Sequence, residues 1–136
     1  MMLFYRWVLN PNILVSYCIS ARLHELPGLI EKYNLEFCAD KLLLEEFSIV
    51  IERERIRKYL LNETGFYKEI IIKFLRVHNT TPNYKGSPDV NDDYLIDIVQ
   101  QANAVGLVTG DKALLKWKNS PVQIVSWKNF RLTYPL

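Results

Sequence analysis

A short apolar run that leads into a polar turn and then into a helix constrains this chain more than any other feature. Val105 to Val108 suits a buried strand, Thr109-Gly110-Asp111 follows it, and a helix is predicted from Ala113. In parallel sheets that are covered by helices, functional groups lie at the carboxyl ends of the strands. Asp111 is therefore predicted to stand at a functional edge, although a carboxylate just before a helix is also an ordinary N-cap.

The rest of the chain alternates between strand and helix patterns. Strands are predicted at Leu3–Leu9, Leu35–Ala39, Val105–Thr109 and Val122–Ser126. Helices are predicted at Ile13–Ser20, Leu26–Tyr33, Lys41–Leu61, Phe66–His78, Asn91–Asn103 and Ala113–Trp117. The predicted cap of the first helix is Asn12, Pro11 closes the strand before it, and a loop is predicted from Asn79 to Pro88. This alternation predicts a three-layer α/β/α sandwich with a central parallel sheet.

The composition is that of an ordinary globular protein and excludes few classes of function. A chain of 136 residues fits a single domain over residues 1–136, and its net charge of +2 neither requires nor excludes a nucleic-acid partner. Cys18 and Cys38 both lie in apolar runs and are predicted to be buried free thiols. No segment is predicted to be a signal peptide or to span a membrane, so we expect a cytoplasmic protein.

Acidic residues accompany the predicted strand ends in several segments. Glu45 and Glu46 lie in the first turns of the helix after the second strand. Asp92 and Asp93 open the helix that precedes the strand leading to Asp111. Clustered carboxylates repel one another, so they stay ionised together only around a cation. Oxygen ligands without His or Cys suit Mg²⁺ or Mn²⁺, and the pattern predicts a metal site that activates water for phosphoryl chemistry.

Four blocks of sequence together resemble the PIN-domain family. The blocks are Leu9 to Ser16, Leu43 to Phe47, Asp89 to Asp93 and Gly106 to Leu115. The most specific are Thr-Gly-Asp-Lys-x-Leu-Leu and Asp-x-x-Asp-Asp at their mutual spacing, and the resemblance extends over about Val8 to Trp127. PIN domains are metal-dependent ribonucleases and include many toxin components of bacterial toxin–antitoxin pairs. The resemblance therefore implies a PIN-like fold and cleavage of single-stranded RNA with Mg²⁺ or Mn²⁺ as the cofactor.

The resemblance also implies which residues form the site and which partners the chain has. The implied metal ligands and catalytic residues are Glu46, Asp92, Asp93 and Asp111, with Asp92 and Asp93 as alternatives for one position. Glu46 is preferred to Glu45 because the family's acidic residue directly precedes the apolar position that Phe47 occupies. Supporting hydrogen bonds are implied for Asn10, Asn12 and Thr109. The implied partners are RNA, a cognate antitoxin and a second copy of the chain.

One position departs from the family pattern. PIN domains carry an aspartate at the end of the first strand, whereas this chain has Asn10 followed by Pro11. An amide oxygen can still face a cation, but the site loses one full negative charge. Removing residues that merely hold metal ligands in place costs roughly 10–100-fold in affinity or activity, and a lost ligand charge should cost at least that.

Two other functions are compatible with parts of this pattern. The chain could be a PIN module that binds nucleic acid or protein without catalysis, its acids being ordinary helix N-terminal residues. A phospho-acceptor receiver domain is also a parallel α/β fold, but it needs an acidic pair after the first strand, where this chain has Asn10-Pro11-Asn12. A basic rim for phosphates is a further candidate feature, formed by Lys112, Lys116, Lys118, Lys128 and Arg131.

Overall fold

The strands form one sheet in which every neighbouring pair is parallel. A computed structural model describes residues 3–136, and its sheet has the order β3-β2-β1-β4-β5. The strands are β1 (Tyr5–Leu9), β2 (Leu35–Ala39), β3 (Leu75–Val77), β4 (Gly106–Thr109) and β5 (Ile124–Ser126). Trp7 is in register with Phe37 of β2 and with Gly106 of β4. The central strand β1 therefore pairs with one strand of each half of the sheet, β2 on one side and β4 on the other.

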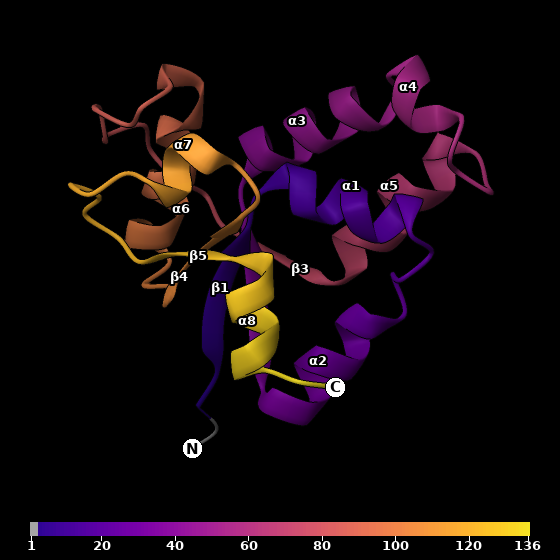
Figure 1. Cartoon of the computed structure of the whole chain (residues 1–136), viewed down its shortest axis with the longest axis horizontal. Helices are drawn as coiled ribbons and strands as arrows, with labels where there is room; N and C mark the ends of the chain where they lie inside the picture. Colours follow the sequence, from indigo (N-terminus) through magenta and orange to yellow (C-terminus); the bar gives the residue numbers. More distant parts are fainter. Residues whose placement is uncertain (1–2) are drawn as a thin grey trace.

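Helices cover both faces of the sheet and produce three layers (Figure 1). One layer consists of α1 (Pro11–Ile19), α2 (Glu25–Tyr33), α3 (Lys41–Ile51), α4 (Glu54–Arg57), α5 (Thr64–Lys73) and α8 (Trp127–Thr133). The other layer holds α6 (Asp93–Gln101), which follows the short 3-10 helix η1 (Val90–Asp92), and α7 (Lys112–Leu115). The buried strands are apolar because helices shield them on both sides, as in other parallel sheets. The predicted three-layer α/β/α sandwich with a central parallel sheet is confirmed.

The strand order places a topological switch point between β1 and β4. The chain first adds β2 and then β3 on one side of β1, and α6 then carries it back across the sheet to β4 and β5 on the other side. At such a reversal the connections leave in opposite directions, and a crevice opens at the carboxyl ends of the two strands. Asn10 follows β1 at this crevice, and Gly110 and Asp111 follow β4. The topology alone thus brings these segments together.

The first helix begins earlier than the sequence pattern predicts. It starts at Pro11 instead of Ile13, and its N-cap is Asn10 instead of Asn12. The Asn10 side-chain oxygen accepts a hydrogen bond from the backbone N–H of Asn12 at 3.2 Å. Proline suits the first helical position because its missing N–H would have no helical partner there. Pro11 therefore opens the helix, and the prediction that it only closes the strand was wrong.

Three further element boundaries differ from the prediction. The helix predicted to reach Leu61 ends at Ile51, and the extended backbone of Arg53 separates it from α4. The helix predicted to reach His78 ends at Lys73 and is followed at once by the edge strand β3. The segment after Ser126, where no element was predicted, is the helix α8, and Ser126 caps it by accepting from the backbone N–H of Asn129.

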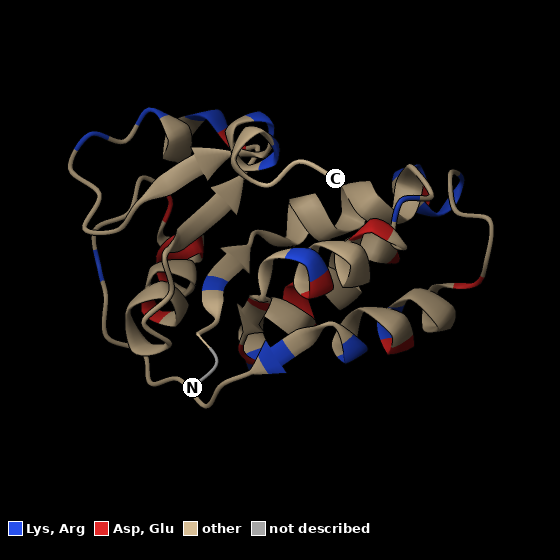
Figure 2. Ribbon diagram, turned by 90° about the horizontal axis from the view of Figure 1, so that it is seen from below, with Lys and Arg blue, Asp and Glu red and all other residues tan. Residues whose placement is uncertain are grey.

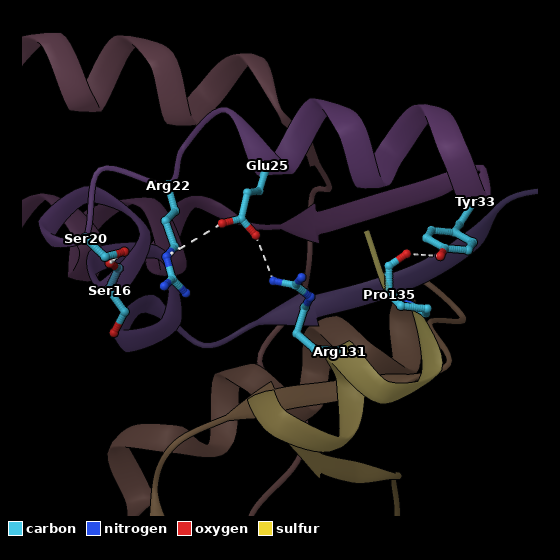
Figure 3. Close-up of polar contacts among 7 residues, drawn as sticks. All are labelled: Ser16, Ser20, Arg22, Glu25, Tyr33, Arg131 and Pro135. Atoms are coloured by element: carbon cyan, nitrogen blue, oxygen red, sulfur yellow. Dashed lines mark hydrogen bonds and ion pairs between the residues drawn. The ribbon is translucent and has the colours of Figure 1, made fainter.

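Side-chain contacts fix the C-terminal helix α8 on the molecule. Glu25 of α2 accepts a hydrogen bond from Arg131 at 2.7 Å and forms an ion pair with Arg22 at 3.7 Å (Figure 3). The Tyr33 hydroxyl donates to the backbone oxygen of Pro135 nearby (Figure 3). The buried ring of Phe130 packs against Trp7 of the central strand at 5.2 Å between centroids. The last helix thus completes the core beside α1 and α2.

The predictions about the two cysteines and about membrane-spanning segments can be compared directly with the structure. Cys18 and Cys38 are both buried and unpaired, as predicted. Among residues 3–136, no helix is both long and apolar enough to cross a membrane.

Candidate functional site

Asn10 lies at the carboxyl end of β1 and makes two different contacts. Its side chain is buried, with 7% of the residue exposed. The amide oxygen caps α1, and the amide nitrogen donates to the hydroxyl of Thr109 at 3.1 Å. Thr109 is fully buried at the end of β4, and its hydroxyl also accepts from the backbone N–H of Asp111 at 3.0 Å. The ends of the two central strands are therefore joined through one threonine hydroxyl.

Asp111 is fixed in position by the helix that it caps. One carboxylate oxygen accepts from the backbone N–H groups of Ala113 at 2.8 Å and Leu114 at 3.4 Å. The second oxygen has no hydrogen-bond partner within residues 3–136 and remains available. A side chain added at Gly110 would lie 4.0 Å from the amide nitrogen of Asn12, so the start of α1 runs beside this turn. Asn12 is exposed there, whereas Asn10 is enclosed.

Asp92 is an acid in this region whose pKa is clearly raised by its surroundings. Burial raises the pKa of its carboxyl to about 6, and the negative charges of Asp89, Asp111, Glu46 and Asp93 raise it further in that order of effect. The charges of Asp111 and Glu46, which belong to two other segments of the chain, thus act on the carboxyl of Asp92. The acids predicted from three separate segments, α3, η1 and the β4–α7 turn, are therefore coupled electrostatically.

Asp93 is adjacent in sequence but is engaged elsewhere. Its carboxylate accepts from the backbone N–H of Ser87 at 3.0 Å and from the Ser87 hydroxyl. These hydrogen bonds, with that of the Ser87 hydroxyl first, lower the pKa of Asp93 below its usual value. Asp93 therefore holds the loop before η1, whereas the charges of Asp111 and Glu46 act on Asp92.

Glu46 and Glu45 also point in different directions. The Tyr94 hydroxyl donates to one carboxylate oxygen of Glu46, which links α3 to α6 across the edge of the sheet. Glu45 lies on the outer side of α3, where its half-exposed carboxylate is 3.9 Å from the Lys41 ammonium. Of the two glutamates, Glu46 is therefore the one directed to the acidic region.

Sequence reasoning missed Tyr94 and Asp40. Burial, followed by the hydrogen bond to Glu46, raises the pKa of the Tyr94 hydroxyl far above its usual value, so the hydroxyl remains a donor. Asp40 directly follows β2, caps α3 by accepting from the backbone N–H of Leu43 and accepts from the hydroxyl of Thr80 at 2.6 Å. Its charge also acts on Tyr94. The place of Asp40 directly after a strand, like that of Asn10, was the signal that could have found it.

The acids at the switch point fit a hard divalent cation. Glu46, Asp92 and Asp111 offer oxygen atoms only, and no ion pair in the described part of the chain involves any of them. Their negative charge is therefore not compensated by a Lys or Arg side chain, although Asp92 is half-buried. Within residues 3–136 their oxygens do not all lie within 4.8 Å of one another. Mg²⁺ keeps several water molecules and takes few carboxylates directly, so a site for it does not require all three carboxylates to touch the ion.

Comparison with known proteins supports the fold. No family profile and no curated protein matches the sequence. The structure is similar to a chain in the crystal structure of VapBC2 from Rickettsia felis bound to a DNA fragment from their promoter. The TM-score is 0.59 at 16% sequence identity, and the match covers 90% of this chain and 98% of that chain. The likeness concerns the fold, and it confirms the predicted PIN-like α/β/α architecture.

The strand order also separates this fold from a receiver domain. Receivers have a doubly wound sheet of order 2-1-3-4-5, in which the third strand lies next to the first. Here β4 lies next to β1, and β3 is at the far edge beyond β2. The receiver alternative is therefore excluded by topology as well as by the absence of an acidic pair after β1.

Proposed function

We propose that this protein is a PIN-type ribonuclease that hydrolyses single-stranded RNA and depends on Mg²⁺ or Mn²⁺. The observation that carries the proposal is the negative charge around Asp92, which Glu46 and Asp111 contribute from other segments and no ion pair compensates. A divalent ion is the usual way in which proteins keep such carboxylates ionised together. The position at a switch point of a parallel sheet is the ordinary place for a catalytic crevice.

Each residue of the proposed site has a distinct role. Asp92, Asp111 and Glu46 would hold the ion, and Asp92 is preferred to Asp93 because the Ser87 contacts occupy Asp93. When bound, the ion supplies an activated water and stabilises charge on the phosphoryl group. Tyr94 orients Glu46, and Thr109 positions the turn that carries Asp111. Asn12 is exposed beside that turn and would contact the RNA.

The basic residues near the acidic edge support a nucleic-acid substrate. Lys and Arg positions recur along the segment from α7 through β5 to α8 (Figure 2). This segment leaves the sheet at Asp111, so its first basic residue, Lys112, begins α7 directly beside the proposed catalytic edge. RNA phosphates are attracted by such a series of basic side chains, largely without regard to sequence.

Cleavage assays with matched variants test the proposal. Purified protein should cleave single-stranded RNA in Mn²⁺ or Mg²⁺, and a chelator should abolish the cleavage. Asp111→Asn and Asp92→Asn should each reduce the rate by roughly 10–100-fold or more. Asp93→Asn is the matched control and should reduce it far less. Cleavage that resists both the chelator and the substitutions would come from a contaminating nuclease and would contradict the proposal.

A non-catalytic PIN module is the second candidate function, and Asn10 is the observation that favours it. The Asn10 amide is committed to α1 and to Thr109 through both its polar atoms, and it adds no charge to the site. A module of this kind would bind single-stranded RNA but would not cleave it at any Mg²⁺ or Mn²⁺ concentration. Binding without cleavage would therefore replace the first proposal with this one.

We also propose an antitoxin as the physiological partner. The fold is similar to that of a chain from the VapBC2 complex, although the identity is only 16%. A small reading frame beside this gene would supply the candidate partner. Co-expression of the two proteins should give a complex that co-purifies, and a lone gene whose product purifies without a partner would contradict the toxin–antitoxin assignment.

A further inference from the structure

Three side chains of different chemistry converge where β2 pairs with β3. Glu36, Cys38 and His78 each present a ligand atom within 4.8 Å of those of the other two. Glu36 and Cys38 are two residues apart in β2, so their side chains point to the same face. His78 directly follows β3, and its backbone N–H donates to the oxygen of Ala39 at 2.7 Å. The pairing of β2 with β3 therefore creates the cluster.

The cluster contains a polar atom without a partner. Nε2 of His78 is buried and has no hydrogen-bond partner among residues 3–136. A buried polar atom left unpaired costs free energy, so such atoms in native proteins usually meet a water molecule or an ion. Burial also raises the pKa of the Cys38 thiol to about 12, so the thiol is neutral unless a cation stabilises its thiolate.

We propose that Glu36, Cys38 and His78 bind a transition-metal ion of the Zn²⁺ class. A thiolate, an imidazole and a carboxylate are the ligands that Zn²⁺ prefers, and three protein ligands with one open position form a familiar tetrahedral arrangement. Mg²⁺ does not suit a site that contains sulfur and nitrogen. This site is therefore chemically distinct from the oxygen-only acidic edge, and it does not depend on the proposed nuclease activity.

Neighbouring residues are compatible with such an ion. Nε of Arg6 donates to Oε1 of Glu36 at 3.2 Å, which orients the carboxylate and leaves its other oxygen for the ion. Binding would release the thiol proton of Cys38 to solvent, and the thiolate would offset part of the charge of the ion, while the Glu36 carboxylate is shared between the ion and Arg6. His78 also lines a surface cavity of about 330 Å³ with Asp40 and Thr80, which provides a route from solvent.

Cobalt(II) absorption tests the proposal in the full chain. Metal-free protein titrated with Co²⁺ in excess Mg²⁺ should develop a thiolate charge-transfer band and intense visible bands of a tetrahedral ion, with one ion per chain. Zn²⁺ should displace Co²⁺ and should raise the melting temperature, because an ion that binds only the folded state stabilises it. Absence of both bands in the parent protein would overturn the proposal.

Variants make the test specific. Cys38→Ser should lose the charge-transfer band, and His78→Gln should weaken Co²⁺ binding by at least roughly 10–100-fold. Cys18→Ser is the matched control, because Cys18 is the other buried free thiol and its pKa is likewise raised to about 12. Circular dichroism establishes that each variant is folded. A band that survives Cys38→Ser, or that disappears in Cys18→Ser, would contradict the assignment.

Asp111→Asn separates this site from the acidic edge. It should leave Co²⁺ binding unchanged while it lowers RNA cleavage. If the nuclease proposal fails and the cobalt bands persist, only the first proposal is lost. If Asp111→Asn removes the cobalt bands, the ion binds at the acidic edge and the Glu36–Cys38–His78 site is refuted.

Discussion

At position 10 an amide occupies the point where the first strand meets the acidic edge. Asn10 donates to the Thr109 hydroxyl, and that hydroxyl also accepts from Asp111. The Thr109 hydroxyl accepts from both residues, so its own proton points away from them. Rotation about the C–O bond would let this hydroxyl donate to position 10 instead. An aspartate at position 10 would accept from Thr109 in place of donating to it. The local structure is therefore able to accommodate the charged residue of the same size.

Asn10→Asp is expected to strengthen the metal site. The added charge should raise Mn²⁺ affinity and RNA cleavage by roughly 10-fold or more, the scale on which even indirect changes act. In chelator the same charge joins an acidic cluster and should lower the melting temperature. Calorimetric melting with and without Mn²⁺ measures both effects. Asn62→Asp, an exposed change in the α4–α5 turn, is the control; an equal response of both variants to Mn²⁺ would place position 10 away from a metal.

Asp92 should make the stability of the metal-free protein depend on pH. Its folded pKa is about 6, above the unfolded value of about 3.9, so its protonated form is favoured in the folded state. The stabilisation is complete below about pH 4 and is lost as the pH rises through about 6. After allowance for solvent screening of this half-buried group, the free energy of unfolding should fall by about 1–2 kcal/mol.

Urea denaturation in chelator at pH 4.5 and pH 7 measures this effect. Asp92→Asn should remove the fall. Asp93→Asn is an informative control because the pKa of Asp93 is lowered, so its contribution is present at neutral pH and is lost as the solution becomes acidic. The two variants should therefore change the pH dependence in opposite directions. Identical profiles would contradict the different surroundings of these adjacent residues.

At the scale of elements, the strength of the pattern determined what the sequence could predict. The central strands β1, β2 and β4 were predicted because they are short apolar runs buried on both faces. The edge strand β3 was missed because it has only three residues, is partly exposed and directly follows a helix. The break before α4 was missed because charged residues from Glu52 to Lys58 suit either a solvated helix or a turn.

The acidic site was predictable only to the level of the segment. Acidic residues near the predicted strand ends indicated which segments of the chain would contribute to the site. Asp92 and Asp93 are consecutive, and side chains one residue apart on a helix point about 100° apart. Which of them faces the site depends on the Ser87 contact, and that contact depends on the path of a loop. No periodic pattern encodes such a path, so the choice required the structure.

That loop provides a prediction about a single element. Asp97 is buried in α6 and accepts from the backbone N–H groups of Asn83 at 3.2 Å and Tyr84 at 2.8 Å. Asp97→Ala removes these charge-assisted bonds and should cost about 1–3 kcal/mol in the free energy of unfolding. The freed loop should be cut faster by trypsin after the exposed Lys85. Gln100→Ala, an exposed change in the same helix, should leave both measurements unchanged; equal cleavage rates for the two variants would show that Asp97 does not hold the loop.

At the scale of the whole molecule, charge is distributed unevenly although the net charge is only +2. One series of basic residues follows Asp111 in the segment from α7 to α8, beginning with Lys112 directly after it. A second series lies in and around α4, on the far side of the molecule from α7 (Figure 1). Both have the composition of a phosphate-binding surface, and the position of the acids distinguishes them. If RNA enters at the acidic edge, the first series should matter and the second should not.

Salt-dependent binding by the Asp111→Asn variant, which binds RNA without efficient cleavage, compares the two series. In that background Lys116→Glu with Lys118→Glu should weaken binding to single-stranded RNA. It should also lower the slope of log affinity against log salt by about 0.7 for each RNA phosphate that the protein no longer neutralises. Arg55→Glu with Arg57→Glu changes the net charge equally but lies in α4, so it should leave the slope unchanged. Equal weakening in both double variants would mean that net charge alone drives binding, and a larger effect of the α4 pair would move the RNA path away from the acidic edge.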